Sequence, residues 1–296
     1  TWRFEAIGTA WEIQTSAPLP ADVRAAVTAL IDRFDAEWSR FRPDSLVSRL
    51  ARGEGSVELP PDAADMLAAY AELSEATRGA VNPLIGGALE RLGYGPGYRL
   101  QADEAAVVVA TPDWRDVVSW DDDRLSLSTP ATLDVGALGK GRLVDLVLAH
   151  VAQHARGDVV VDASGDLAVR GAPVRIGLEH PYDPSRAIGV ATIQDGALCA
   201  SATNRRAWGD GLHHVLDART GEPVRTVAAT WAIAPGGVGR AGAMRADAIA
   251  TALFFDGGPQ LARSWDISWV RMLTDGRVEY SPDSAVELFT RASVDS

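Results

Sequence analysis

Leu-Asp-Val-Gly-Ala-Leu-Gly-Lys-Gly, residues 133–141, joins a short extended segment to an apolar helical pattern that continues to about residue 155. The first N–H groups of a helix have no partner within it, and together with Lys140 they suit a bound phosphate. The stretch is not a Walker A loop, because its glycines lack the required spacing and no Ser or Thr follows Lys140. The alternative interpretation is a tight turn that only begins the helix.

Lys140 is the single lysine of the chain, although the sequence contains 28 Lys and Arg residues. An ammonium group is a compact point charge, whereas a guanidinium is a planar fork. In a chain that otherwise uses Arg, a lysine between Gly139 and Gly141 therefore indicates a site that needs the compact group. Survival of one lysine by chance is the alternative.

On both sides of this stretch, apolar spacing predicts helices mixed with short strands. We expect helices at 21–41, 60–77 and 243–255, with a short helix after Asn82-Pro83. A strand at 2–14 is broken at Gly8-Thr9, and further strands are expected at 125–127, 158–161, 167–169, 174–178, 188–193, 215–216, 228–233, 267–273 and 278–280. Asp195-Gly196 and Asp275-Gly276 have the composition of hairpin turns. This order predicts an α+β fold rather than regular βαβ winding.

Asp247 and Thr251 are four residues apart in the predicted helix at 243–255, so their oxygens share one face. A carboxylate and a hydroxyl, with room for water and phosphate oxygens, suit Mg²⁺. The alternative is purely structural: Asp247 lies near a helix start, and Thr251 can bond to the backbone four residues earlier.

His213, His214 and Asp217 lie within a short polar segment that ends in a glycine turn at Gly221. His214 and Asp217 have the residue types of a general base and the group that orients it. A polar strand end explains the same pattern equally well. Gly237–Gly242 matches a dinucleotide-binding pattern, but too little chain follows for a parallel crossover series, so we expect a glycine-rich loop.

Composition limits the function classes. The chain of 296 residues has a net charge of −12, which argues against binding nucleic acid or an anionic membrane surface. Cys199 is the only cysteine and no apolar stretch reaches about 18 residues, so neither an internal disulfide nor a membrane span is expected. The chain as given would be cytoplasmic, or exported if a signal segment had been removed.

Taken in order along nearly the whole chain, these segments resemble the FAD:protein FMN transferase family, also called the ApbE family. The segments that carry the resemblance are Ile7–Ile13, Phe41–Ser45 with Val47–Leu50, Gly79–Pro83, Leu133–Gly141 with Asp145, Val161–Asp166, His214–Asp217 with Thr220-Gly221, and Ala246–Thr251. Among the departures from the family pattern, Ile7 replaces a usual Met and Asn82 replaces a usual Asp.

The resemblance implies one transferase domain over residues 1–296, of mixed, largely antiparallel sheets packed with helices in two intimately joined sub-domains (T-fold-like). Gly93–Gly97 is the expected place for a joint between them. The implied activity is Mg²⁺-dependent transfer of FMN from FAD to a Ser or Thr hydroxyl of an acceptor protein, through a phosphoester bond, with release of AMP. FAD pyrophosphatase activity, which gives FMN and AMP, and FAD binding without turnover are the alternatives.

The resemblance also implies roles for particular residues. Catalysis would involve His214, Asp217 and Lys140. Mg²⁺ would be held by Asp247, Thr251 and the backbone carbonyl of Ala137. The FAD site would be lined by Ile7, Phe41, Ala80, Val81, Asn82, Asp134, Lys140, His213 and Met244.

Overall fold

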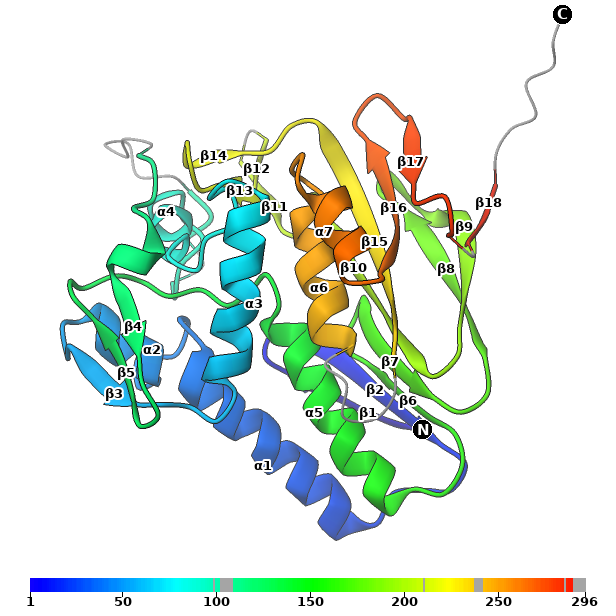
Figure 1. Cartoon of the computed structure of the whole chain (residues 1–296). Coiled ribbons are helices and arrows are strands. Elements are labelled where there is room, and N and C mark those ends of the chain that lie inside the picture. Colours follow the sequence, from blue (N-terminus) through cyan, green and yellow to red (C-terminus); the bar gives the residue numbers. More distant parts are fainter. Residues whose placement is uncertain (98, 102–108, 210, 237–241, 285, 290–296) are drawn as a thin grey trace, which may run out of the picture.

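The computed structural model describes residues 1–97, 99–101, 109–209, 211–236, 242–284 and 286–289. Its centre is an eight-stranded sheet in which every neighbouring pair is antiparallel (Figure 1). In spatial order the strands are β1 (Trp2–Ala6), β2 (Thr9–Thr15), β6 (Val159–Asp162), β7 (Asp166–Arg170), β10 (Gly196–Ala202), β15 (Val227–Pro235), β16 (Ser268–Leu273) and β17 (Val278–Tyr280).

Smaller sheets surround this one. They are β18 (Val286–Leu288) with β9 (Asp183–Ile193) and β8 (Val174–His180); β3 (Ser56–Glu58) with β5 (Arg124–Leu127) and β4 (Val118–Trp120); β11 (Ala207–Trp208) with β12 (Leu212–His213); and β13 (Leu216–Asp217) with β14 (Glu222–Pro223). The helices are α1 (Ala21–Trp38), α2 (Leu46–Ala51), α3 (Ala63–Ala76), α4 (Gly86–Arg91), α5 (Gly139–His154), α6 (Gly242–Ala252) and α7 (Gly258–Ser264), with a 3₁₀ turn at Trp114–Asp116. None of the helices in the described ranges is long and apolar enough to span a bilayer.

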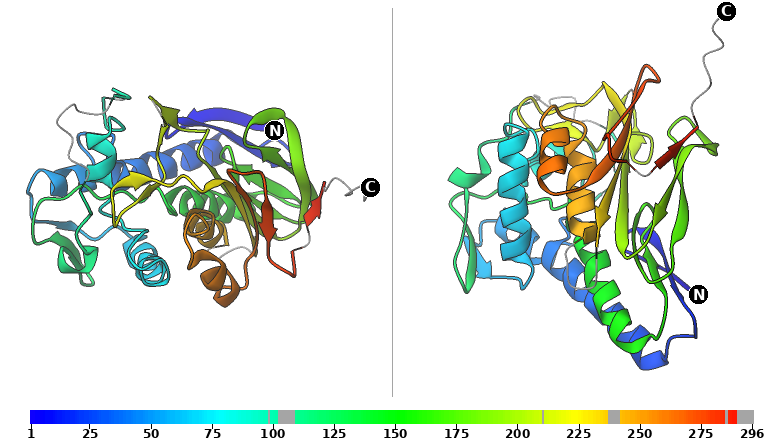
Figure 2. Two further views of the ribbon diagram at one scale, coloured as in Figure 1. Left: turned by 90° about the horizontal axis from the view of Figure 1, so that it is seen from above. Right: turned by 45° about the vertical axis from the view of Figure 1, so that its right-hand side comes forward.

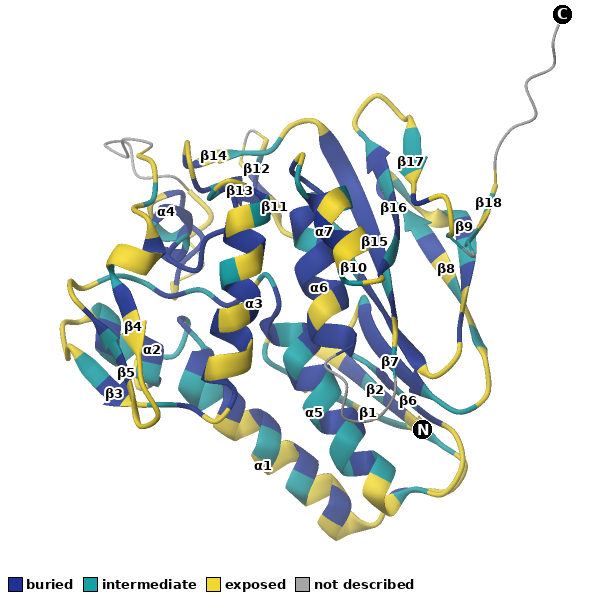
Figure 3. Ribbon diagram, in the orientation of Figure 1, coloured by how far each residue is buried: buried dark blue, intermediate teal, exposed yellow. Residues whose placement is uncertain are grey.

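Two cores make the large sheet the middle of three layers (Figures 2 and 3). Helices α1, α3, α5 and α6 contribute to the larger core on one face of the sheet, and the sheet of β8, β9 and β18 covers the other face. Strand β10 contributes side chains to both cores. Ala197 and Cys199 face the helices and Leu198 faces the smaller sheet, because successive side chains of a strand point to opposite faces.

The α+β fold predicted from the sequence is confirmed. The predicted helices appear as α1, α3, α4, α5 and α6, and Asp275-Gly276 connects β16 to β17 as a hairpin. The interruption at the start of the chain is a two-residue hairpin turn, in which Ile7 and Gly8 have φ of 47° and 74° between the paired residues Ala6 and Thr9. A β-branched residue is rarely found at positive φ, so this turn places Ile7 at a conformational cost.

The hairpin predicted at Asp195-Gly196 is wrong. Strand β9 pairs with β8 and β18, whereas β10 pairs with β7 and β15, so the chain passes from one sheet to another at this turn. Helices α2 and α7 and strands β3, β4 and β18 are among the elements that were not predicted. Within the described residues β18 pairs only with β9, a strand almost a hundred positions earlier in the chain. The loop predicted at Gly237–Gly242 lies outside the described residues except for Gly242, which begins α6.

Candidate functional site

The start of α5 and the first turns of α6 cross at very close range. A Cβ atom on Gly141 would lie 2.2 Å from the backbone oxygen of Ala243 and 2.7 Å from the Cβ of Asp247, so only glycine fits there. The contact allows the Gly141 N–H to donate to Asp247 Oδ2 at 2.9 Å. One of the unpaired N–H groups at the start of α5 is therefore bound by a carboxylate of the neighbouring helix.

Asp145 of α5 fixes the start of α6 in turn. Its Oδ1 and Oδ2 accept the N–H groups of Ala243 and Met244 at 3.0 and 2.8 Å. Burial raises the pKa of this carboxyl group to about 6, against the lowering effect of the two N–H donors. Asp145 thus sets the position of the helix that carries Asp247 and Thr251.

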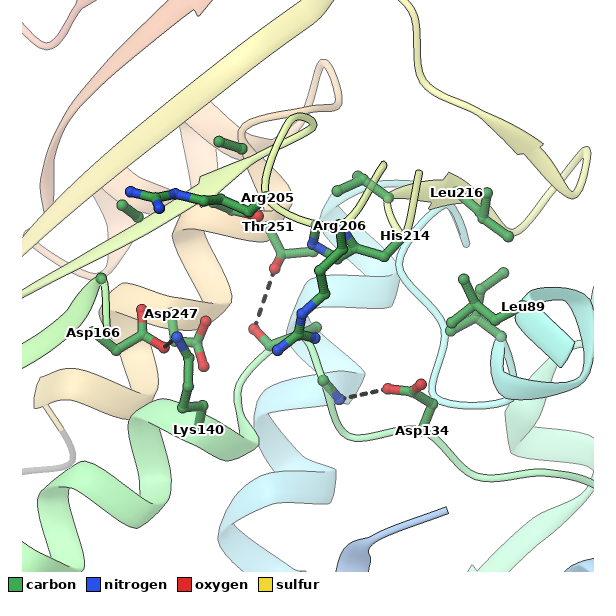
Figure 4. A pocket seen from close by; sticks show the side chains of 18 of the residues that line it. Leu89, Asp134, Lys140, Asp166, Arg205, Arg206, His214, Leu216, Asp247 and Thr251 are labelled. Atoms are coloured by element: carbon green, nitrogen blue, oxygen red, sulfur yellow. Dashed lines mark hydrogen bonds and ion pairs between the residues drawn. The ribbon is translucent and has the colours of Figure 1, made fainter. Parts of the chain in front are cut away.

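Asp247, Thr251 and Ala137, which the family resemblance groups together, all line one cavity. Figure 4 shows Asp247 and Thr251 at its wall. The Thr251 hydroxyl lies 3.4 Å from the Ala137 carbonyl oxygen. Burial and the nearby Asp166 carboxylate raise the pKa of Asp247 well above its usual range, although Lys140 and Arg206 act to lower it. The surroundings of Asp247 therefore disfavour its ionised form.

A divalent cation fits this set of groups. Carboxylate, hydroxyl and carbonyl oxygens are the hard ligands that Mg²⁺ prefers, and a cation would stabilise the buried Asp247 in its ionised form. Within the described ranges no three His, Cys, Asp or Glu side chains are grouped to hold a metal ion. A metal held here would therefore depend on the hydroxyl and the backbone carbonyl, with a substrate phosphate or water completing the shell.

Lys140 lies among carboxylates rather than in open space. Its ammonium is 2.9 Å from Asp166 Oδ2 and also donates to the backbone oxygens of Ala163 and Ser164 at 3.2 and 3.3 Å. Burial alone would lower the pKa of Lys140, but Asp166 and Asp247 outweigh it and raise the pKa. The expectation that Lys140 supplies net positive potential to a phosphate needs correction, because its charge is already balanced by Asp166.

Two cavities meet at this place, with volumes of about 650 and 750 Å³. The first is lined by the metal-ligand candidates, by His214 and by Ala80, Val81 and Asn82; the second is lined by Ile7 and Phe41. The residues that line both are Gly8, Tyr94, Asp134, Gly136, Lys140, Arg205 and Arg206. The structure thus brings most of the predicted site residues to one bilobed space, of a size suited to an extended ligand.

Asp134 lies at the boundary between the cavities and is paired with a residue that the sequence analysis did not single out. Arg40 Nε donates to Asp134 Oδ2 at 2.5 Å, and the Gly136 N–H donates to Oδ1 at 2.6 Å. Burial acts to raise the pKa of Asp134, but Arg40 and the Gly136 N–H outweigh it and lower the pKa. Asp134 is therefore ionised and fixed in orientation near neutral pH.

His214 lines the first cavity in its neutral form. Burial, with the nearby positive charge of Arg206, lowers the pKa of His214 to about 3. Its Nδ1 atom is buried and has no hydrogen-bond partner in the part of the chain that the structure describes. Asp217 does not orient this ring as the sequence suggested, because its carboxylate is bound by the guanidinium and the N–H of Arg219.

Three residues predicted for the site do not line either cavity. Asp217 is held in the hairpin of β13 and β14. His213 is buried, with Nε2 2.8 Å from the Val224 oxygen and Nδ1 accepting the Val215 N–H. Met244 is buried at the start of α6. His213 ends β12 and packs inward, whereas His214, in the bend that follows, lines the first cavity.

The neutral His214 predicts a measurable loss of stability in acid. A histidine in the unfolded chain binds a proton near pH 6.5, whereas folded His214 binds one only near pH 3. The unfolded state therefore binds more protons between these values, and the free energy of unfolding falls as the pH drops through this window. Between pH 6.5 and pH 5 we expect His214 to account for a loss of about 1 to 2 kcal/mol.

Urea unfolding of wild-type protein and of His214→Gln at a series of pH values tests this expectation. Asp145 works in the opposite direction, because its raised pKa favours the folded state as the pH falls from about 6 towards 4. The difference between the two proteins removes that common contribution. A difference that stays constant from pH 7 to pH 5 would contradict a neutral His214.

The sequence of this chain is similar to proteins of one known family. A sequence model of the ApbE family matches residues 7–268. The chain is 27% identical to the FAD:protein FMN transferase of Rhodobacter capsulatus, over 96% of this chain and 57% of that protein. It is 25% identical to the protein of the same name from Haemophilus influenzae, over 77% of this chain and 70% of that protein. The chain therefore spans little more than half the length of the Rhodobacter relative.

Solved structures share the fold. The ApbE protein of Thermotoga maritima superposes with a TM-score of 0.77 at 22% identity, covering 95% of this chain and 96% of that chain. The flavinyl transferase ApbE of Pseudomonas stutzeri superposes with a TM-score of 0.77 at 23% identity, covering 95% and 94%. The similarity extends over nearly the whole of each chain.

Proposed function

Because the chain belongs to the ApbE family, we propose that it is a Mg²⁺-dependent FAD:protein FMN transferase. It would move FMN from FAD to a Ser or Thr hydroxyl of an acceptor protein and release AMP. The single observation that carries the proposal is that three segments far apart in the sequence, around Ala137, His214 and Asp247, line one cavity. The names of the relatives from Rhodobacter capsulatus and Haemophilus influenzae support the same activity.

The proposed metal ligands are Asp247, Thr251 and the Ala137 carbonyl. When bound there, Mg²⁺ would neutralise phosphate oxygens and make the phosphorus more susceptible to attack. The chain's own part is to hold these oxygens in place. The Gly141 N–H and Asp145 supply that support, through Asp247 and through the start of α6 respectively.

In the proposed reaction the acceptor hydroxyl oxygen bonds to the FMN-side phosphorus, the phosphorus–oxygen bond to the bridging oxygen breaks, and AMP leaves. The hydroxyl proton must pass to a base, and His214 is the candidate that lines the cavity. With a pKa of about 3 its imidazole is a weak base. A diphosphate beside His214 would oppose the charge of Arg206 and raise the pKa towards the useful range.

Two other functions use the same cavity. A FAD pyrophosphatase would accept water in place of the acceptor hydroxyl and give free FMN and AMP. A binding protein would hold FAD and release neither. The cavity geometry is common to all three, so the products distinguish them.

The test is to incubate the protein with FAD, Mg²⁺ and a candidate acceptor protein, and to measure the acceptor's intact mass and the AMP formed. Transfer predicts an acceptor mass gain of one FMN less one water, with one AMP for each modified acceptor. An acceptor in which the target Ser or Thr is replaced by Ala should gain nothing. Free FMN and AMP without a mass gain would favour hydrolysis, and FAD binding without AMP would favour the binding protein.

A further inference from the structure

Arg206 is a cation at the junction of the two cavities that is not paired with a carboxylate. The structure records no ion pair and no side-chain hydrogen bond for it within the ranges described. The other cations of this region are paired: Lys140 with Asp166, Arg40 with Asp134, Arg42 with Asp35 and Asp44, and Arg205 with Glu179. Arg206 therefore differs from its neighbours in having charge available for a ligand.

Arg206 lies where the two cavities meet. Its side chain lines each of them, and Figure 4 shows it pointing into the space between Asp134 and the group formed by Lys140, Asp166 and Asp247. The positive charge of Arg206 acts to lower the pKa values of both Asp134 and Asp247, which are far apart in the sequence. A ligand that extends from one cavity into the other must pass this side chain.

Negative charge is concentrated around Arg206, so a bound diphosphate would need a further cation there. Asp134, Asp166 and Asp247 all line the first cavity, and a diphosphate entering it would add two further negative charges. Arg40 and Lys140 already balance Asp134 and Asp166. A diphosphate thus needs positive charge beyond these pairs, and a guanidinium suits it because its planar fork can bind two phosphate oxygens at once.

The geometry points to Arg206 as a ligand of the bridging diphosphate of FAD, a role that depends on the proposed function. It would hold the diphosphate at the junction while the riboflavin and adenosine ends occupy the two cavities. The backbone of the same residue interacts with the His214 ring. Phosphate binding by Arg206 would therefore be linked directly to the position of the candidate base.

The test compares ligands with and without phosphate. Binding of FAD and of riboflavin is measured by flavin fluorescence and calorimetry for wild-type protein, Arg206→Gln, Arg206→Lys and Arg205→Gln. Arg206→Gln should weaken FAD binding about 30-fold, as expected for loss of a charged hydrogen-bonded contact, and leave riboflavin binding within about twofold. Arg206→Lys should recover part of the loss, since it keeps the charge without the fork.

Arg205→Gln is the matched comparison, because Arg205 lines the same junction but is already paired with Glu179 at 2.7 Å. Its effect on FAD binding should be no more than about threefold, in keeping with an exposed and compensated charge. Equal losses for FAD and riboflavin in Arg206→Gln, or unchanged FAD binding, would overturn the role of Arg206. Wild-type protein that binds no FAD would instead refute the proposed function, on which this inference rests.

Discussion

We expect replacement of Asp247 with Asn to lower the proposed Mg²⁺-dependent release of AMP from FAD by about 1,000-fold, the scale expected when a group that stabilises charge at the reacting centre is lost. The carboxylate is the only charged member of the proposed metal-ligand set with Thr251 and the Ala137 carbonyl. An amide keeps an acceptor for the Gly141 N–H but removes the negative charge that attracts the metal. The measurements are AMP release at saturating FAD over a range of Mg²⁺ concentrations, and Mg²⁺ binding in the presence of FAD.

The same substitution should leave the protein folded and no less stable. Ionised Asp247 is unfavourable in this buried place without a metal, because its pKa is raised by burial and by Asp166. Removing the charge removes that penalty, so the melting temperature without metal should stay equal or rise. Asp217→Asn is the matched control, since Asp217 is paired with Arg219 outside both cavities, and it should retain activity within a few-fold. Full activity in Asp247→Asn would contradict the metal assignment.

Local patterns in the sequence predicted the positions of some residues of the candidate site. The four-residue spacing of Asp247 and Thr251 fixes their shared face whatever the rest of the fold does. The glycines around Lys140 likewise predicted a helix start, although not why glycine is needed. Gly141 is required by the close approach of α6, a contact between segments more than a hundred residues apart.

The rest of the site depends on pairings that a local pattern does not contain. Asp166 begins β7 and reaches Lys140 only because β7 lies beside the start of α5. The available signal for it was an aspartate directly before the apolar residues Leu167, Ala168 and Val169. Arg206 had no comparable signal among so many arginines, because the lack of a partner is a property of the folded chain. His214 rather than His213 was predicted as the base, and His214 is the one that lines the cavity; its separation from Asp217 was not predictable, because Asp217 pairs with Arg219 in the folded chain.

Lys140→Met should lower the free energy of unfolding by about 3 kcal/mol, because removal of one partner leaves a buried charge uncompensated. Asp166 is 1% exposed, and it would then lie beside Asp247 without the ammonium at 2.9 Å. Urea unfolding at pH 7 measures the loss. If the pair is the cause, the double variant Lys140→Met, Asp166→Asn should recover most of the stability.

The recovery separates structure from chemistry, because the double variant restores charge balance without restoring the ammonium. If Lys140 also positions groups for the proposed reaction, this stable protein should still release AMP far more slowly than wild type. Lys140→Arg tests the shape of the cation: a planar fork cannot reproduce the contacts of one Nζ with Asp166, Ala163 and Ser164, so activity should fall about tenfold with charge retained. Full activity in the arginine variant would remove the reason for a lysine at this position, and an unrecovered double variant would mean that Lys140 stabilises the fold through contacts other than Asp166.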